Sequence, residues 1–194
     1  FPVCTSIGNS AFQSCSALSV ASFPVCTSIG NYAFQSCSAL SVASFPVCTI
    51  VGDTAFQRCS ALSVASFSAC TSVLNNAFQL CSSLSIASFP VCTRIGQYAF
   101  QRCSALSVAS FGAITSLGVE VFRSCSALSQ IYFNFSTSNI PTINANVFAN
   151  TPMSDSSYLG YFGSIYVPES LVDTVKAKNG WSVYADRITG YTPE

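Results

Sequence analysis

Cysteine is the residue type whose number and spacing in this chain could carry chemistry. All eleven cysteines fall on two registers with a period of 22 residues. One register holds Cys4, Cys26, Cys48, Cys70 and Cys92, and the other holds Cys15, Cys37, Cys59, Cys81, Cys103 and Cys125. Thiols in such arrays could bind a metal ion, form disulfide bridges, act as nucleophiles or pack in a core.

Two of these four roles need partners that the sequence does not supply. A zinc site typically uses Cys-x-x-Cys pairs or histidines, and this chain has no histidine and no such pair. A nucleophilic thiol needs an activating base, which is usually histidine. The sequence therefore argues against a metal site and against cysteine catalysis, and it indicates no cofactor.

Disulfide bridges between repeats remain a minority alternative to packing. Equivalent positions on neighbouring parallel strands lie about 4.8 Å apart, a separation that a disulfide can span, but their side chains point in parallel. Ile114 replaces the first cysteine in the sixth copy, and Thr151 replaces the second in the seventh. Both are core fillers of similar size, so the pattern favours free thiols that pack as small hydrophobic groups.

The rest of the composition excludes further classes of function. Without histidine there is no Ser-His-Asp set, no glycine-rich phosphate loop is present, and the seven carboxylates do not recur at equivalent positions. The seven Lys and Arg residues are too few and scattered to bind nucleic acid. Apolar runs are too short for membrane insertion, which needs about 20 residues. The chain is therefore not predicted to be an enzyme.

A repeat of 22 residues organises the chain. Copies begin at Phe1, Phe23, Phe45, Phe67, Phe89 and Phe111, and a degenerate seventh begins near Phe133. A period of this length is typical of a solenoid, whose units bury their apolar faces against one another. The segment LSVASF predicts a short strand because it alternates. The glycines Gly30, Gly52 and Gly96 indicate a turn. We expect Asn31, Asp53 or Asn75 then to cap a short helical turn, and the variable tenth and fourteenth positions to face solvent.

The string Ile29-Gly30, Ala33-Phe34, Cys37 and Leu40 resembles the BspA-like (Treponema pallidum type) leucine-rich repeat family, in six copies over residues 1–129. The tail over 165–188 also resembles that family's C-terminal end, although the family unit usually has 23 residues. The resemblance implies an α/β repeat solenoid: right-handed, with short strands on the concave face and a C-terminal capping helix. It also implies adhesion by a surface or secreted protein.

We expect three parts: six repeats over 1–132, a degenerate seventh with an inserted loop over 133–163, and a strand–helix cap over 164–194. The segment ESLVDTVKAK, from Glu169, is the predicted helix, because it is acidic at its start and basic at its end. No comparable cap is evident near Phe1, so we expect further repeats, another domain or a partner there.

Side chains that point out of the strands form the first candidate binding face. If Ala21, Phe23 and their equivalents point inward, the outward set is Val20, Ser22, Val42, Ser44, Val64, Ser66, Ile86, Ser88, Val108, Ser110, Gln130 and Tyr132. The alternative is a slip of one residue, which would turn the valines inward. A second candidate surface holds Tyr32, Arg58, Arg94, Tyr98 and Arg102. The alternative is that these are scattered, solvated surface side chains without a binding role.

These surfaces favour a non-catalytic recognition module with a protein partner. A rigid spacer or fibre segment that displays another domain is the main alternative. A glycan partner ranks lower, since exposed aromatic residues are needed and only Tyr32, Tyr98 and Tyr132 are candidates.

Overall fold

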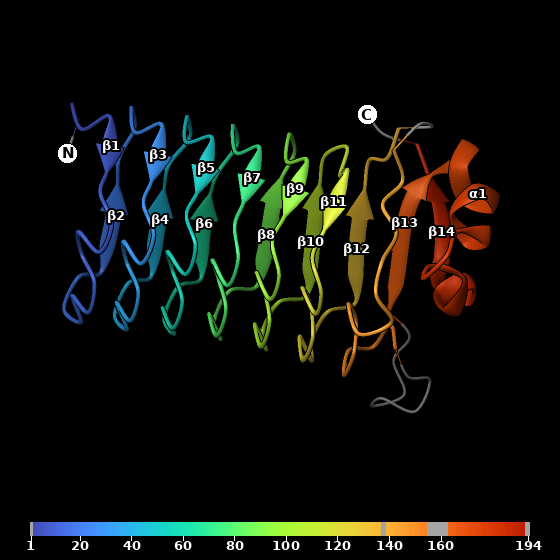
Figure 1. Cartoon of the computed structure of the whole chain (residues 1–194). Coiled ribbons are helices and arrows are strands. Elements are labelled where there is room, and N and C mark those ends of the chain that lie inside the picture. Colours follow the sequence, from blue (N-terminus) through green and yellow to red (C-terminus); the bar gives the residue numbers. More distant parts are fainter. Residues whose placement is uncertain (1, 137–138, 155–162, 193–194) are drawn as a thin grey trace.

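The chain folds as a parallel β-solenoid. The computed structural model describes residues 2–136, 139–154 and 163–192, and parts of the predicted seventh repeat, 137–138 and 155–162, lie outside them. Each of the six regular repeats contributes one short and one longer strand, and successive repeats stack side by side (Figure 1). Within the described residues, no helix is long and apolar enough to cross a membrane.

The short strands form one six-stranded parallel sheet, which we call the short-strand face. Its strands are β1 (Ser6–Ile7), β3 (Ser28–Ile29), β5 (Ile50–Val51), β7 (Ser72–Val73), β9 (Arg94–Ile95) and β11 (Ser116–Leu117). In each strand the first residue is exposed or half-buried and the second is buried, so the sheet faces water on one side only.

The longer strands form what we call the long-strand face. They are β2 (Val20–Ser22), β4 (Val42–Ser44), β6 (Val64–Ser66), β8 (Ile86–Phe89), β10 (Val108–Phe111), β12 (Gln130–Phe133), β13 (Ser164–Pro168) and β14 (Ile188–Tyr191). The first three make one sheet and the last five another. Equivalent residues pair across the repeats, such as Val42 with Val64.

The strand register is the one that the sequence favoured. Ala21, Phe23 and their equivalents point into the core, whereas Val20, Val64 and Ile86 point outward and are each more than half exposed. The slipped alternative is therefore wrong. The reason is side-chain volume. The large phenylalanine of each repeat fills the interior, whereas the slipped register would put the smaller valine inside and expose the phenylalanine to water.

Two ladders of phenylalanine rings fill the core. Phe23 and its equivalents stack at 5.2–5.9 Å between centroids, and Phe12 and its equivalents stack at 5.0–5.7 Å. Rings of one ladder meet rings of the other edge-on, as Phe34 meets Phe45 at 5.8 Å. Both ladders have nearly the same spacing, so the stack is nearly straight (Figure 1).

The predicted helical turn and α/β class are wrong for the repeats. Residues equivalent to 31–36 form turns without a helix, and the tenth and fourteenth positions have left-handed backbones, such as Tyr32 (φ 59°) and Arg58 (φ 61°). A helix about 10 Å wide beside strands about 4.8 Å apart would bend the stack into a concave face. The compact turns match the strand spacing, which explains the straight stack.

Asparagine and aspartate link repeats rather than cap a helix. The Oδ1 atom of Asn31 accepts a hydrogen bond from the backbone N–H of Asp53 at 2.9 Å, and Asp53 Oδ1 accepts one from Asn75 at 2.9 Å. The preceding glycines serve close approach between repeats, since a Cβ at Gly52 would lie 2.6 Å from a backbone carbon of Gly30.

The C-terminal end is covered as predicted, but with less helix than the sequence suggested. The segment from Glu169 divides into a 3-10 turn (Glu169–Leu171) and a short helix α1 (Val172–Ala177), followed by a second 3-10 segment (Ser182–Arg187). Trp181 is fully buried against the rings of Phe133 and Phe135, and its Nε1 donates to the Pro141 carbonyl at 2.7 Å.

Candidate binding surface

The cysteines lie in the core and carry free thiols. All eleven are unpaired, nine are buried, Cys4 is half-buried and Cys15 is exposed. Cys81 Sγ donates to the Phe56 carbonyl at 3.1 Å, and its equivalents make the same contact with the preceding repeat. Burial is the main cause that raises the pKa of Cys59 and Cys103 to about 12. Ile114 and Thr151 occupy the same buried sites, which confirms them as core fillers.

A metal ion needs a group of ligating side chains that lie close together. Among the residues that the structure describes, no group of three or more His, Cys, Asp or Glu side chains could hold a metal ion. Attention therefore falls on the surfaces of the solenoid.

The long-strand face presents an apolar strip beside a row of hydroxyl groups. The outward residues of β2, β4, β6, β8 and β10 are valine or isoleucine at the first position and serine at the third. Val20 and Val64 are 53% exposed and Ile86 is 57% exposed, whereas Val42 and Val108 are half-buried. None of these positions carries a charge, so the strip is neutral as well as apolar.

A shallow hollow lies where this face is interrupted. The three-stranded sheet ends at β6 and the five-stranded sheet begins at β8, so strand pairing is broken between them. The hollow has a volume of about 290 Å³ and is lined by Ser63, Val64, Ala65, Ser85, Ile86 and Ser88. Ala65 is only partly buried here, unlike its equivalents in the other repeats. Val64 and Ile86, each more than half exposed, thus flank a recess.

Three tyrosines gather at the C-terminal end of the same face. Tyr132 on β12 pairs in register with Tyr166 on β13, and their rings stack at 4.4 Å with an angle of 8°. Tyr191 on β14 meets Tyr132 edge-on at 5.6 Å. All three are half-buried. Sequence reasoning found Tyr132 but missed Tyr166 and Tyr191, because the tail does not keep the 22-residue period.

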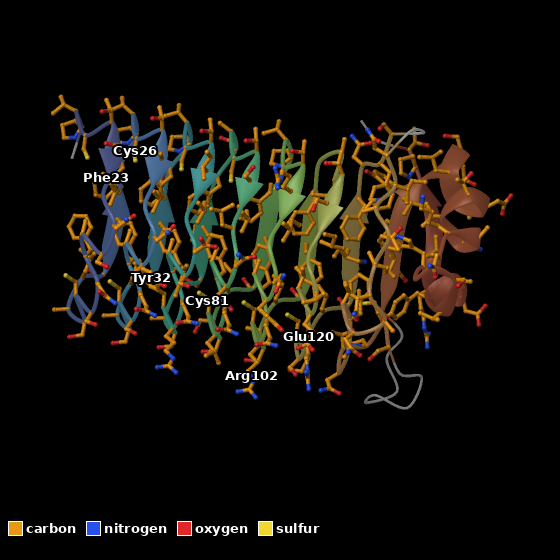
Figure 2. All side chains as sticks on the ribbon, in the orientation of Figure 1. Phe23, Cys26, Tyr32, Cys81, Arg102 and Glu120 are labelled. Atoms are coloured by element: carbon orange, nitrogen blue, oxygen red, sulfur yellow. The ribbon has the colours of Figure 1, made fainter. Side chains whose placement is uncertain are left out.

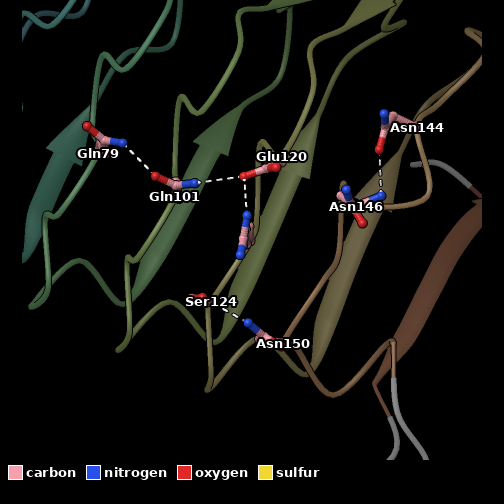
Figure 3. A network of polar contacts seen from close by, with 8 residues as sticks. Gln79, Gln101, Glu120, Ser124, Asn144, Asn146 and Asn150 are labelled. Atoms are coloured by element: carbon pink, nitrogen blue, oxygen red, sulfur yellow. Dashed lines mark hydrogen bonds and ion pairs between the residues drawn. The ribbon is translucent and has the colours of Figure 1, made fainter.

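A ladder of glutamine side chains joins the repeats along another line. Gln13, Gln35, Gln57 and Gln79 each donate from Nε2 to Oε1 of the glutamine in the next repeat, for example Gln79 to Gln101 at 2.6 Å. Gln101 donates to the carboxylate of Glu120, which also accepts from Arg123 at 2.8 Å (Figure 3). The repeated glutamine was visible in the sequence, but its role was not predicted.

The second candidate surface is divided by the fold. Tyr32, Arg58, Tyr98 and Arg102 lie on the turns, and Figure 2 shows Arg102 at the lower edge of the stack. Arg94 lies on β9 of the short-strand face instead. The variable positions are also not uniformly solvent-facing, because Thr54 is only 8% exposed. The equivalent position in the preceding repeat holds the much larger Tyr32.

The profile of the BspA type Leucine rich repeat region matches the sequence in six copies, over residues 5–113 and 49–166. These matches span most of the chain. The chain belongs to the BspA-type leucine-rich repeat family. Its BspA-type repeats are the stacked units described above, each with one short strand, one longer strand and a turn.

Two solved structures of leucine-rich proteins are similar to this chain. A leucine-rich cell surface protein from Faecalibacterium prausnitzii is 20% identical with a TM-score of 0.54, over 87% of this chain and 60% of that one. A leucine-rich repeat protein from T. pallidum is 23% identical with a TM-score of 0.47, over 66% of this chain and 51% of that one. The first likeness shows the fold. Among curated protein sequences, none matches.

Proposed function

We propose that this chain is a non-catalytic recognition module of a surface or secreted protein, and that it binds a protein partner through the long-strand face. The observation that carries the proposal is the neutral apolar strip, in which Val20, Val64 and Ile86 are each more than half exposed. Contiguous exposed apolar area on a protein that must stay in solution marks an interaction site. The similar Faecalibacterium protein is a leucine-rich cell surface protein, which supports a cell-surface location. In that location the module would serve adhesion to host proteins or other cells.

The hollow between β6 and β8 is the proposed position of the partner's anchoring side chain on the apolar strip. Binding energy concentrates where an anchoring side chain fills a recess and excludes water. Val64 and Ile86 flank a recess of about 290 Å³, and parallel strands hold both side chains in place. A partner with an apolar anchor and a neutral polar rim matches this surface.

The test uses the purified chain and two triple variants that carry the same added charge. The long-strand variant carries Val42→Lys, Val64→Lys and Ile86→Lys, on three successive repeats. The control variant carries Ser28→Lys, Ile50→Lys and Ser72→Lys on the short-strand face. Each is screened by surface plasmon resonance against immobilised fibronectin, laminin, collagen and fibrinogen, after circular dichroism confirms folding.

Binding that only the long-strand variant loses supports the proposal. Binding that both variants keep contradicts it, and directs attention to the turn surface of Tyr32, Arg58, Tyr98 and Arg102. Absence of binding to every protein favours the alternative of a rigid spacer.

The spacer has an observation of its own in its favour. Side-chain ladders run through the stack, because the glutamines bond to one another and Thr27, Thr49 and Thr71 each donate to the preceding threonine carbonyl. Among the described residues, no buried side-chain nitrogen or oxygen lacks a partner. A straight, fully bonded stack of this kind suits the display of another domain at a fixed distance.

A further inference from the structure

The outer face of the Tyr132 ring forms an aromatic step on the long-strand face. One face of this ring is stacked on Tyr166, with nearly parallel planes. Because the two rings stack across neighbouring strands, the face of Tyr132 away from Tyr166 is the one on the side of β10, and Tyr191 meets the ring edge-on at 5.6 Å. The register partner of Tyr132 on β10 is Ser110, and the next residue along is Ser88 on β8. A serine side chain is too short to cover a phenol ring, so the ring stands at the end of a row of hydroxyl groups.

The polar groups around the Tyr132 ring are uncharged. Tyr132 Oη donates to Gln130 Oε1 at 3.5 Å, and Gln130 is the other outward residue of β12. The amide of Gln130 and the hydroxyls of Ser110 and Ser88 can each donate and accept hydrogen bonds. The outward positions from β8 to β14 are isoleucine, valine, serine, glutamine, tyrosine, proline and threonine, none of them ionised at neutral pH.

We propose that Tyr132, Ser110 and Gln130 form a subsite for one sugar ring of a neutral glycan. A pyranose ring has an apolar face of C–H groups that stacks on an aromatic ring. Its rim carries hydroxyls that each donate and accept, which the serines and the glutamine amide can satisfy. Rigid aromatic contact with a few placed polar groups is the usual composition of a small-ligand site.

Other ligands fit the same groups less well. A proline-rich peptide also stacks on aromatic residues, but its proline carbonyls only accept, so they use the serine hydroxyls as donors alone, whereas sugar hydroxyls use them as both donors and acceptors. A cation prefers a carboxylate beside the ring, and the outward positions hold none. An anionic glycan would need a basic group that these positions also lack. Burial and the neighbouring Tyr166 raise the pKa of Tyr132, which keeps its phenol a neutral donor.

The sugar subsite does not depend on the protein-binding role proposed for Val64 and Ile86, which lie on other strands. The experiment titrates the chain with three neutral oligosaccharides (cellohexaose, mannohexaose and chitohexaose), followed by calorimetry and by the NMR signals of the tyrosine rings. Decaproline is the competing probe.

Three variants make the test specific. Tyr132→Ser continues the serine row of the preceding repeats, Tyr132→Phe keeps the ring face, and Tyr98→Ser is the control. The control position already holds Ser10 in the first copy.

The expected result is that at least one hexaose binds and shifts the Tyr132 ring signals. Tyr132→Ser then weakens binding by about tenfold or more, whereas Tyr132→Phe and Tyr98→Ser stay within about threefold. The long-strand lysine variant keeps this binding, which separates the subsite from the protein-binding proposal. The inference is overturned if no hexaose binds, if decaproline binds in their place, or if Tyr132→Ser binds as tightly as the original chain. Equal losses in the Phe and Ser variants would also overturn it, because the stacked face would then not be the determinant.

Discussion

A thiol reagent should divide the cysteines of the folded chain into two classes. Cys15 is exposed and Cys4 is half-buried, whereas the other nine are buried. The thiolate is the reactive species, and burial raises the pKa of Cys59 and Cys103 from 9.0 to about 12. At about pH 8 this shift alone lowers their thiolate fraction, and hence their reactivity, by a factor of about a thousand.

Access to the reagent lowers the rate further. A buried thiol reacts only when its repeat opens, and an opening that costs about 4 kcal/mol slows labelling by another factor of about a thousand. Burial also raises the pKa of Cys26 and Cys37, but they lie in the second repeat, next to the first repeat, whose Cys4 and Cys15 are not fully buried. We therefore expect Cys26 and Cys37 to react next, before any central repeat opens.

The assay follows colour release from Ellman's reagent with the folded chain and with the chain in concentrated guanidinium chloride. Peptide mass spectrometry identifies the labelled residues, and Cys15→Ser removes one equivalent of the fast phase as a control. Fast labelling of Cys4 and Cys15 alone is the expected result. Fast labelling of more than half of the eleven cysteines in the folded chain would refute the argument that the thiols are core fillers.

Three further predictions concern stability. Gln57→Leu breaks two hydrogen bonds of the glutamine ladder and should lower the free energy of unfolding in urea by about 1–2 kcal/mol. Gln13→Leu, at the end of the ladder, breaks one bond and should lower it by about half as much. Equal losses for the two variants would contradict the stabilising role of the ladder. Arg58→Gly should leave stability unchanged or raise it by about 1 kcal/mol, because φ is 61° there, and Arg58→Val should lower it; the reverse order would count against strain at this site. Stability should fall as pH rises from 9.0 toward about 12, because the unfolded thiols ionise in that range while buried ones such as Cys59 stay neutral. The loss is about 1.4 kcal/mol per buried thiol at about pH 10, measured by urea unfolding, and a flat profile would contradict it.

Much of the fold could be predicted from the sequence because equivalent positions in successive repeats can be compared within the one chain. Positions that never vary, such as Phe34 and Leu40, had to be core, and positions that vary had to be more tolerant. The alternation in LSVASF together with one large phenylalanine determined which face of each strand is buried. The end cover was predictable because Trp181 and Tyr184 add apolar area where the repeat pattern stops.

The remaining features depend on interactions that a single copy does not display. The turns near Tyr32 and Arg58 have left-handed backbones held by bonds to the next repeat, such as Tyr32 N–H to the Asp53 carbonyl at 2.9 Å. Local patterns therefore suggested a helical turn that the stacking does not permit. Tyr166 and Tyr191 join Tyr132 only through strand pairing in the tail, where no period sets the register.

The measurement that tests the binding surface most directly is methyl NMR of the chain with the protein partner identified in the screen. The methyl groups of Val64 and Ile86 report on the long-strand face, and those of Ile50, Val47 and Val91 are exposed elsewhere and act as internal controls. The account predicts that the Val64 and Ile86 signals shift or broaden on binding while the three controls stay unchanged. Shifts at the controls with unchanged Val64 and Ile86 would contradict it.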